Sequence, residues 1–267
     1  MTIGFIGAGH MASAIIYGIV SSGEYKKRDI YIFDVNEELR RHYISEGFNV
    51  VGSEAELVLA SNIVFLCVRQ PALPGVLNAI RGVVTSKNVI VSIIAGISIG
   101  LIKSVLGQEC KVIRSMPNMP ASICKGVTAI SYDMPITYAE LTRTKELFET
   151  IGSVEILPEE QMNEVISVSS SSPAYVYMLM RAMVEGGVQQ GMDKDVAERL
   201  VFETVAGSVE YAKLSGQSLD DIIASICSPN GTTIRAVDYL DKKGFEQSVK
   251  DAMLVCTKRA YMLEKEI

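Results

Sequence analysis

The 267-residue sequence has few of the residues that metal centres and covalent hydrolases require. It contains two histidines, His10 and His42, so a histidine-based metal centre or a Ser-His-Asp triad has little material. Its five cysteines are widely spaced and form no CxxC pair, a pattern that favours reduced thiols over a disulfide framework or a zinc site. The sequence therefore predicts neither metal-dependent nor acyl-enzyme chemistry.

Long apolar runs and charge of a single sign are also missing. No span reaches the roughly 18 uncharged apolar residues of a membrane helix, and the first residues form neither a basic segment nor a small-residue cleavage site. The formal charge is −6 and the pI about 5.1, and the basic residues are scattered among acidic ones, so there is no basic stripe for nucleic acid. We therefore expect a cytoplasmic protein that binds neither membranes nor nucleic acid.

The N-terminal stretch has the pattern of a dinucleotide-binding turn. The apolar run at residues 2–6 leads into Gly7-x-Gly9-x-x-Ala12, and a helical pattern follows at once. Gly7 permits a tight turn, Gly9 lets the backbone approach phosphates, and Ala12 lets helix and strand pack closely. The N–H groups of the first helical turn would face the pyrophosphate. Asp34 ends the next β-type run, about 20 residues further on, as the motif requires.

The first half of the chain alternates apolar runs with helical patterns. After the first strand we expect strands near residues 29–33, 48–51, 62–68, 88–92, 111–115, 127–132 and 153–157, and helices near residues 11–22, 36–45, 53–60, 98–106 and 138–150. Residues 62–68 are apolar throughout, as in a parallel strand that is covered on both faces. This alternation predicts an α/β fold with a Rossmann-type doubly wound sheet over residues 1–158.

Three loops follow expected parallel strands and so should lie at the carboxyl edge of the sheet. Arg69 begins the first loop, residues 93–96 form the second, and Asn118 stands between two prolines in the third. The prolines fix the backbone around Asn118, whose amide is suited to bond a carboxamide, although a simple proline turn is the alternative. These loops are candidates for cofactor contact.

From residue 159 onward the sequence shows no convincing strand. Helical patterns cover residues 159–169, 174–191, 194–215, 219–226, 232–242 and 245–266, separated by glycine, proline or serine breaks. We therefore predict a second, all-helical domain over residues 159–267. Its broad apolar surfaces, such as residues 174–180, exceed what one domain of this size would cover, which predicts a homodimer or a larger assembly.

Two turns in the helical half are candidates for binding a small anion. The serine-rich residues 167–175 form either a flexible linker or, because Pro173 suits the first turn of a helix, a helix start with free N–H groups. Residues 228–233, Ser-Pro-Asn-Gly-Thr-Thr, form a tight turn that opens another helix and carries two threonine hydroxyls. Such a turn is often only a turn, so both interpretations stay open.

Together these pieces resemble the pyrroline-5-carboxylate reductase family over essentially the whole chain. The match is carried by GFIGAGHMASAI at the start, residues 62–70, Ile94-Ala-Gly96, Arg114-Ser-Met-Pro-Asn-Met-Pro120, Ser171-Ser-Pro-Ala-Tyr175 and the turn at residues 228–233. The resemblance implies hydride transfer from NAD(P)H to the C=N carbon of 1-pyrroline-5-carboxylate, giving L-proline in the last step of proline biosynthesis. It also implies a Rossmann domain and interlocked helical domains that form dimers and often decamers.

The resemblance also implies roles for individual residues. Those placed at the cofactor are Gly7, Gly9, His10 and Met11 at the pyrophosphate, Val68 and Arg69 beside the cofactor, Ala95 and Gly96 near the nicotinamide, and Asn118 on its carboxamide. Those placed at the substrate are Ser171, Asn230, Gly231, Thr232 and Thr233. Thr233 would hydrogen-bond the ring nitrogen and orient the substrate. An imine that is already protonated in water demands no catalytic histidine or lysine.

The sequence departs from the family pattern at several positions. Ser170 and Ser172 stand where the family usually has glycine, which predicts a tighter or more polar pocket. Arg69 and Gln70 replace the usual Lys-Pro. Asn230 replaces the first glycine of the second turn, and asparagine tolerates left-handed backbone.

Asp34 bears on the choice of cofactor, because it would bond a ribose hydroxyl and repel a 2′-phosphate. We therefore expect a preference for NADH, which Arg40 and Arg41 would soften only if they are not surface residues. Two alternatives stay open: a related reductase of another cyclic imine or a small keto acid, and a non-catalytic paralogue that binds nucleotide. The presence of both Asn118 and Thr233 argues against the second.

Overall fold

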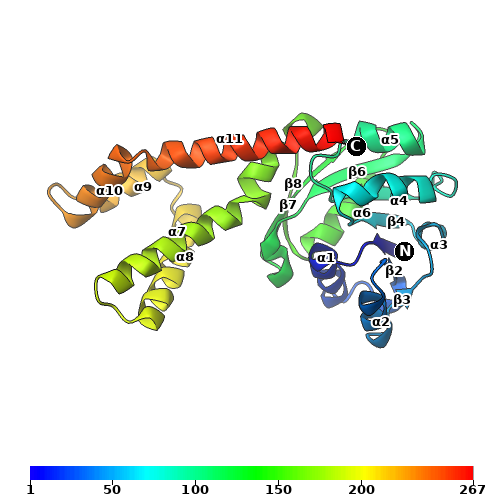
Figure 1. The fold of residues 1–267 in the computed structure, drawn as a ribbon, viewed down its shortest axis with the longest axis horizontal. Helices are drawn as coiled ribbons and strands as arrows, with labels where there is room; N and C mark the ends of the chain where they lie inside the picture. The colour runs from blue at the N-terminus through cyan, green and yellow to red at the C-terminus, as the bar shows by residue number, and fades with distance from the viewer. Residues whose placement is uncertain (267) are drawn as a thin grey trace. The chain divides into compact units, whose positions relative to one another are not determined.

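A computed structural model describes residues 1–266, and these residues divide into two compact units (Figure 1). The first unit comprises residues 1–171 together with the described residues from 255 onward, and the second comprises residues 172–254. The chain thus leaves the first unit once and returns to it within its last helix. The boundary predicted at residue 158 coincides with the end of the sheet, whereas the compact units divide at residue 171.

One eight-stranded sheet, in the order β3-β2-β1-β4-β5-β6-β7-β8, forms the centre of the first unit. Its strands are β1 (Ile3–Ile6), β2 (Ile30–Phe33), β3 (Asn49–Val50), β4 (Ile63–Leu66), β5 (Val89–Ser92), β6 (Lys111–Met116), β7 (Gly126–Tyr132) and β8 (Gly152–Ile156). Neighbouring strands are parallel except β6 and β7, which are antiparallel. The strand order reverses at β1, which pairs with both β2 and β4, and ligands of doubly wound sheets bind outside the carboxyl ends at such a point.

Helices cover both faces of this sheet, as the continuous apolar run of β4 predicts. Ile63 and Phe65 of β4 belong to a core with α1 (His10–Ser21), α2 (Glu37–Ser45) and α6 (Tyr138–Glu149). Val64 and Leu66 belong to a separate core with α3 (Glu54–Ala60), α4 (Leu73–Ile80) and α5 (Ile99–Leu106). All four side chains are buried, so the predicted doubly wound α/β fold is confirmed.

The second unit is helical, and among the described residues no strand follows Ile156. Its helices are α7 (Ser172–Gln189), α8 (Lys194–Ser215), α9 (Leu219–Ile226), α10 (Thr232–Lys242) and the first part of α11 (Phe245–Leu263), which ends in the first unit. The buried core of this unit is small, formed by Val184, Ala197 and Val201 between α7 and α8. Many apolar side chains therefore remain at its surface.

The structure differs from the sequence-based expectation in two segments. The helix α4 was not predicted, because Pro74 and Gly75 are residues that usually interrupt a helix. Pro74 lies in the first turn of α4, where proline is tolerated. A continuous helix over residues 159–169 was predicted, but the chain forms a short 3-10 turn at Glu159–Gln161 and a π-helical turn at Ile166–Ser170. The Glu159 carboxylate accepts a hydrogen bond from the Ile99 N–H at 2.6 Å, so tertiary contacts override the local helical pattern.

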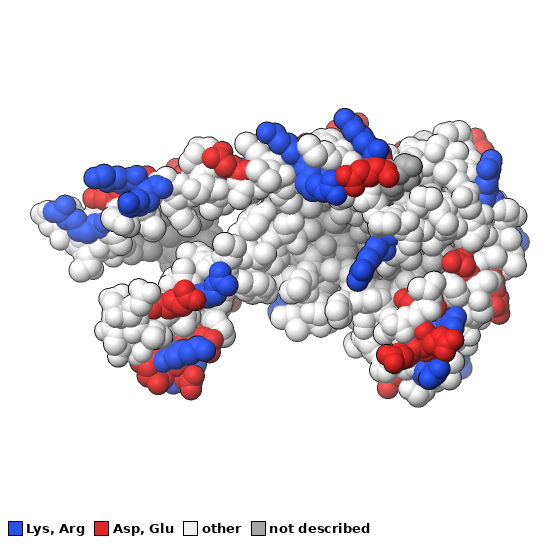
Figure 2. All heavy atoms as spheres, in the orientation of Figure 1, with Lys and Arg blue, Asp and Glu red and all other residues white. Residues whose placement is uncertain are grey.

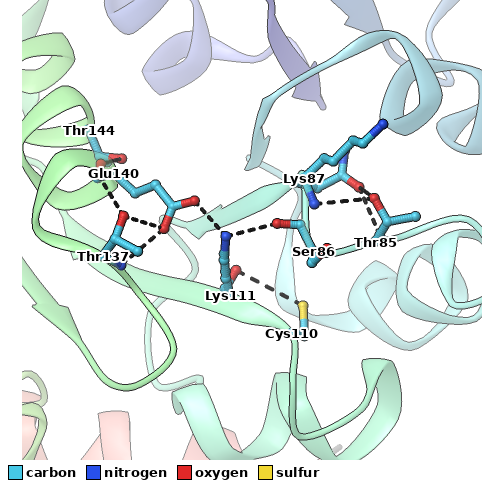
Figure 3. A network of polar contacts seen from close by, with 9 residues as sticks. Thr85, Ser86, Lys87, Cys110, Lys111, Thr137, Glu140 and Thr144 are labelled. Atoms are coloured by element: carbon cyan, nitrogen blue, oxygen red, sulfur yellow. Dashed lines mark hydrogen bonds and ion pairs between the residues drawn. The ribbon is translucent and has the colours of Figure 1, made fainter.

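Polar side chains close the amino edge of the sheet (Figure 3). Lys111, the first residue of β6, donates to the Glu140 carboxylate at 2.6 Å and to the Ser86 carbonyl oxygen at 2.8 Å. Glu140 also accepts from the N–H and hydroxyl of Thr137, which together form a capping box at the start of α6. Burial alone would raise the pKa of Glu140, but these hydrogen bonds outweigh it and lower the pKa. The network fixes strand and helix ends.

The surface shows no one-sided charge on the face drawn in Figure 2, where basic and acidic side chains are interspersed. The five cysteines are free thiols. Within residues 1–266, no helix combines the length and apolar character that crossing a bilayer demands.

Candidate functional site

The glycine turn after β1 is built as the sequence predicts. Gly7 has φ +91°, and a Cβ there would lie 2.6 Å from the Cys67 carbonyl oxygen, so the position accepts only glycine without rearrangement. The Gly7 N–H donates to the Phe33 carbonyl oxygen at 2.8 Å, which ties the turn to the end of β2. Gly9 differs, because a Cβ built there would meet nothing within 4 Å. The backbone at Gly9 is therefore open to a ligand.

The start of α1 lacks a protein cap. Gly9 is its N-cap residue, no side chain accepts from the first-turn N–H groups, and that turn contains no acid. His10 and Met11 are its first residues, and Ala12 is buried against the sheet. Unpaired N–H groups and the positive end of the helix dipole suit an anionic group such as a pyrophosphate.

Asp34, at the end of β2, holds the turn in place. One carboxylate oxygen accepts from the Ala8 N–H at 2.7 Å, and the other accepts from the Asn36 N–H at 2.8 Å. The Asn36 side chain in turn caps α2 by accepting from the Glu38 N–H at 2.8 Å. The acid predicted to contact the cofactor is thus fixed beside the glycine turn.

A cavity of about 560 Å³ opens at this edge of the sheet, where the strand order reverses. Five of the residues predicted at the cofactor line it, namely Gly7, Gly9, Asp34, Val68 and Arg69. Glu54, Ala72 and Val76 line it as well. The sequence interpretation did not place these three residues at the cofactor. Glu54 is the first residue of α3 and follows its N-cap Ser53, and this predicted helix start was the only sequence signal for its position. Ala72 and Val76 lie beside and in α4, a helix that was not predicted.

The remaining side chains around this cavity supply little acid-base chemistry. On α2, Arg40 and Arg41 form ion pairs with the Glu37 carboxylate, with nitrogen–oxygen distances of 3.9 Å and 2.8 Å, as expected for a charged surface helix. Cys67 lines the cavity, but burial raises the pKa of its thiol, so the thiol stays protonated. The open turn, the uncapped helix and the cavity fit the adenosine and pyrophosphate of a dinucleotide.

The predicted cofactor loop at residues 93–96 lies against the end of α11. Gly96 has φ +73°, and a Cβ there would lie 2.6 Å from the Ala260 carbonyl oxygen. Ala95 packs against the buried cluster that contains Met116 and Ala260. The last turns of α11 therefore cover the loop predicted near the nicotinamide.

Asn118 is largely buried, and its amide joins three segments. The amide nitrogen donates to the Ser169 carbonyl oxygen at 3.2 Å, and the amide oxygen accepts from the Val127 N–H at 3.0 Å. One of the two amide N–H groups is thereby used, so a bond to the nicotinamide carboxamide would have to use the second N–H or the second lone pair of the amide oxygen. That role stays a prediction.

The serine-rich segment is ordered rather than a flexible linker. Its π-helical turn leads into α7, which begins at Ser172 with Pro173 in its first turn. The Ser170 hydroxyl donates to the Pro117 carbonyl oxygen at 3.3 Å, and the Ser171 hydroxyl oxygen accepts from the Cys256 thiol at 3.4 Å. The structure therefore brings Ser171 into the region of Asn118 within the first unit.

The other predicted substrate residues form one turn in the second unit. Asn230 has φ +61°, the left-handed conformation expected of it. Gly231 is the N-cap of α10, and no side chain caps that helix start. Thr232 and Thr233 are the first two residues of α10. The Gly231 N–H donates to the Ser228 carbonyl oxygen at 3.0 Å, so the turn presents the N–H groups of Thr232 and Thr233 together with two hydroxyls, a combination that suits a carboxylate.

A further cavity, of about 490 Å³, lies at the opposite, amino edge of the sheet and is lined by Tyr25, Lys87, Glu140 and Arg143 among others. The Glu140 carboxylate is already bonded to Lys111 and Thr137 and is not available as a base. Parallel strands of doubly wound folds bind ligands at their carboxyl edge, and we assign the cofactor to that edge.

The fold and the site at its carboxyl edge define a nucleotide-dependent oxidoreductase, and comparison with known proteins agrees. Residues 2–96 match the family model "NADP oxidoreductase coenzyme F420-dependent". Residues 159–263 match the model "Pyrroline-5-carboxylate reductase dimerisation". Together with the full-length relatives described next, this shows that the chain belongs to the pyrroline-5-carboxylate reductase family, so the resemblance found in the sequence is confirmed.

The similarity to named relatives extends over nearly the whole chain. Pyrroline-5-carboxylate reductase of Escherichia coli is 32% identical over 264 residues, which cover 98% of each protein. Pyrroline-5-carboxylate reductase 3 of Danio rerio is 33% identical, with 97% of this chain and 90% of that protein covered. The crystal structure of Plasmodium falciparum pyrroline carboxylate reductase with NADP bound superposes with a TM-score of 0.92 at 26% identity, covering 99% of this chain and 98% of that one.

Proposed function

We propose that this protein reduces 1-pyrroline-5-carboxylate to L-proline with NAD(P)H, the last step of proline biosynthesis. The observation that carries the proposal is the open glycine turn and uncapped start of α1 in a chain that aligns from end to end with pyrroline-5-carboxylate reductases. When bound, the reduced nicotinamide supplies a hydride. The hydride forms the new C–H bond at the imine carbon, the C=N π electrons move to nitrogen, and the proton already on nitrogen completes the secondary amine.

The chain's own residues would bind and orient the two reactants. The N–H groups at Gly9, His10 and Met11 would hold the pyrophosphate, because no side chain caps them. Val68 and Arg69 would contact the cofactor from the loop after β4. Ala95, Gly96 and Asn118 would define the nicotinamide end. With these contacts the protein only has to position the two reactants, since the hydride comes from the cofactor.

The substrate would be bound by the turn before α10. The N–H groups of Thr232 and Thr233 and the Thr232 hydroxyl are suited to the carboxylate, since a helix start stabilises an anion without a cation. The Thr233 hydroxyl would hydrogen-bond the ring nitrogen and fix the face of the imine. Asn230 sets the turn through its left-handed backbone, and Ser171 contributes a hydroxyl.

We further propose that NADH is the preferred cofactor. Asp34 and Glu54 place two carboxylates on the wall of the cofactor cavity, and both would repel a 2′-phosphate. Arg40 and Arg41 on α2, which would soften this preference, are paired with Glu37. A ribose 2′-hydroxyl, by contrast, donates a hydrogen bond that a carboxylate accepts.

The protein would act as a homodimer, with a decamer as the larger assembly. The match to a dimerisation family supports self-association. The second unit also exposes at least half of each of several large apolar side chains, among them Tyr177, Met178, Leu200, Phe202 and Leu214. Monomeric proteins seldom leave so much apolar surface in water. The free cysteines suit a reducing compartment such as the cytoplasm.

The direct test mixes purified protein with 1-pyrroline-5-carboxylate and either NADH or NADPH. Nicotinamide absorbance and proline, the latter measured by mass spectrometry, are followed together. We expect stoichiometric loss of reduced cofactor and gain of proline, faster with NADH at equal concentrations. If the protein binds the cofactor but forms no proline, and oxidises NADH or NADPH in the presence of a six-membered cyclic imine, it is instead a related imine reductase.

A further inference from the structure

We propose that Gln70 is a positioning residue that fastens the cofactor loop after β4 to the end of α11. This inference deepens the proposed function, because it rests on the assignment of that loop to the cofactor. Gln70 follows Arg69 directly and begins a short 3-10 turn, Gln70–Ala72, for which Arg69 is the N-cap residue. Any restraint on Gln70 is therefore transmitted to the backbone of Arg69, which lines the cofactor cavity.

The restraint is a hydrogen bond between residues that are far apart in sequence. The Gln70 side-chain nitrogen donates to the Leu263 carbonyl oxygen, across 193 positions of the chain. Leu263 is the last residue of α11, a 3-10 turn over Glu264–Glu266 follows it directly, and its carbonyl oxygen has two lone pairs and can accept the additional bond from Gln70. The Gln70 amide thus ties a predicted cofactor loop to the junction between α11 and this turn.

The end of α11 is a firm anchor, so the helix holds the loop. Ala260 is buried and belongs to a cluster with Met116 at the end of β6 and with Met162. On the same helix, the Thr257 hydroxyl donates to the Ser167 hydroxyl oxygen at 3.1 Å, and the Tyr261 hydroxyl donates to the Glu164 carboxylate at 2.7 Å. These contacts fix successive turns of α11 to the first unit.

The same helical turn also touches the other cofactor loop. A Cβ on Gly96 would lie 2.6 Å from the Ala260 carbonyl oxygen and 2.9 Å from the Leu263 Cβ, so the backbone of this loop lies directly against α11. Leu263 is therefore in contact with the loop after β4 through Gln70 and with the loop after β5 through Gly96. One residue of α11 sets the spacing of two loops that are predicted to bind the cofactor.

Loss of this bond should weaken cofactor binding without touching the substrate turn. A loop that is free in the absence of ligand has to be ordered when the cofactor binds, and ordering a few side chains lowers affinity by about threefold to tenfold. We expect Gln70→Ala to raise the Kd for NADH by that factor. The KM for the imine should stay within about twofold of wild type, since residues 230–233 are unaltered.

The hydrogen-bonding chemistry of the Gln70 side chain gives a sharper test. Gln70→Glu has the same shape but no donor, and its charge repels the Leu263 carbonyl oxygen, so it should bind NADH no better than Gln70→Ala. Gln70→Lys restores a donor and should recover most of the lost affinity. The matched control is Gln190→Glu: the Gln190 side-chain nitrogen also donates to a backbone carbonyl, that of Gly186 at 3.1 Å, but in the second unit.

A double-mutant cycle identifies Leu263 as the partner. A chain that ends at Tyr261 lacks the acceptor, so Gln70→Ala should have no further effect on the Kd for NADH in that background. The Kd is measured by nicotinamide fluorescence without substrate, so the result is independent of whether the imine assay succeeds. Wild-type affinity in Gln70→Glu overturns the proposal, as do additive effects in the cycle. If the shortened chain fails to fold, the contrast between Gln70→Glu and Gln70→Lys decides.

Discussion

The Asp34 carboxylate accepts a hydrogen bond from the Ala8 N–H at 2.7 Å. Ala8 lies between the two glycines of the dinucleotide turn, so the acid expected to contact the ribose also holds the turn that binds the pyrophosphate. A carboxylate oxygen has room for more than one donor, and the two tasks are compatible. Changes at Asp34 should therefore alter both cofactor choice and the shape of the turn, and the two effects have to be separated.

Replacing Asp34 by Asn separates them. The amide oxygen can still accept from the Ala8 N–H, and the bond to the Asn36 N–H is lost together with the negative charge, so repulsion of a 2′-phosphate should fall while the glycine turn keeps its own bond. We expect the ratio of kcat/KM for NADH to that for NADPH to drop about tenfold or more, which corresponds to about 1.4 kcal/mol. Glu54→Gln removes a charge from the same cavity wall and should shift the ratio less. An unchanged ratio in Asp34→Asn would assign the preference to other residues.

Thr233→Ala should lower catalytic efficiency through the substrate alone. Removal of a hydroxyl that bonds a charged ring nitrogen costs roughly 1.5–3 kcal/mol, or about tenfold to a hundredfold in kcat/KM for the imine. The Kd for NADH should not change. Thr233→Ser retains the hydroxyl and should keep most of the activity, and equal activity of the alanine variant would exclude the proposed role.

Gly231→Ala tests the close contact within the substrate turn. The backbone of Gly231 suits any residue, at φ −72°, but a Cβ would lie 2.5 Å from the Ser228 hydroxyl oxygen and 3.0 Å from the Ser228 carbonyl oxygen. The turn should open and shift Thr232 and Thr233, raising the KM for the imine by about tenfold. Adding Ser228→Ala removes the nearer atom and should restore part of the loss; no restoration would point to a different cause.

The stability of the fold should fall at alkaline pH through Cys110. Burial raises the pKa of this thiol to about 11, above its value in the unfolded chain. The folded state therefore gains from Cys110 below the unfolded pKa, near 8.5, and loses that gain as pH rises toward 11. Between pH 7 and pH 10 the free energy of unfolding of wild type should drop by about 2 kcal/mol relative to Cys110→Ala. Urea unfolding at both pH values measures the difference.

Local patterns in the sequence were sufficient for most elements of this fold. Ser98 caps α5, near the start of the helix predicted at residues 98–106, by accepting from the Leu101 N–H at 3.1 Å. The bounds of α8, α9 and α10 are those that glycine and proline breaks indicate. The alternating runs predicted the doubly wound sheet, because strands buried on both faces must be apolar throughout. Elements with clear starts and stops need little help from tertiary structure.

Long-range contacts decided what the sequence could not. Residues 159–169 have a helical pattern, yet the Ile99 N–H donates to Glu159 and the neighbouring Ser170 hydroxyl donates to the Pro117 carbonyl oxygen, and the segment forms separate 3-10 and π-helical turns instead of one α-helix. Asn118 was a reasonable candidate as a single residue, but its bonds to Ser169 and Val127 depend on the assembled fold. The substrate roles of residues 230–233 stay predictions.

The first unit is discontinuous, and this has a consequence for its biosynthesis. Ala260, part of the buried cluster at the carboxyl edge, is translated only after all of residues 172–254. A nascent chain can form its central strands early, but on the ribosome it must leave this edge incomplete until the helical unit has been made. A chain interrupted within the helical unit would therefore expose the apolar residues around Met116 and Met162, a surface that chaperones and proteases recognise, and would not accumulate as a half-built nucleotide-binding protein.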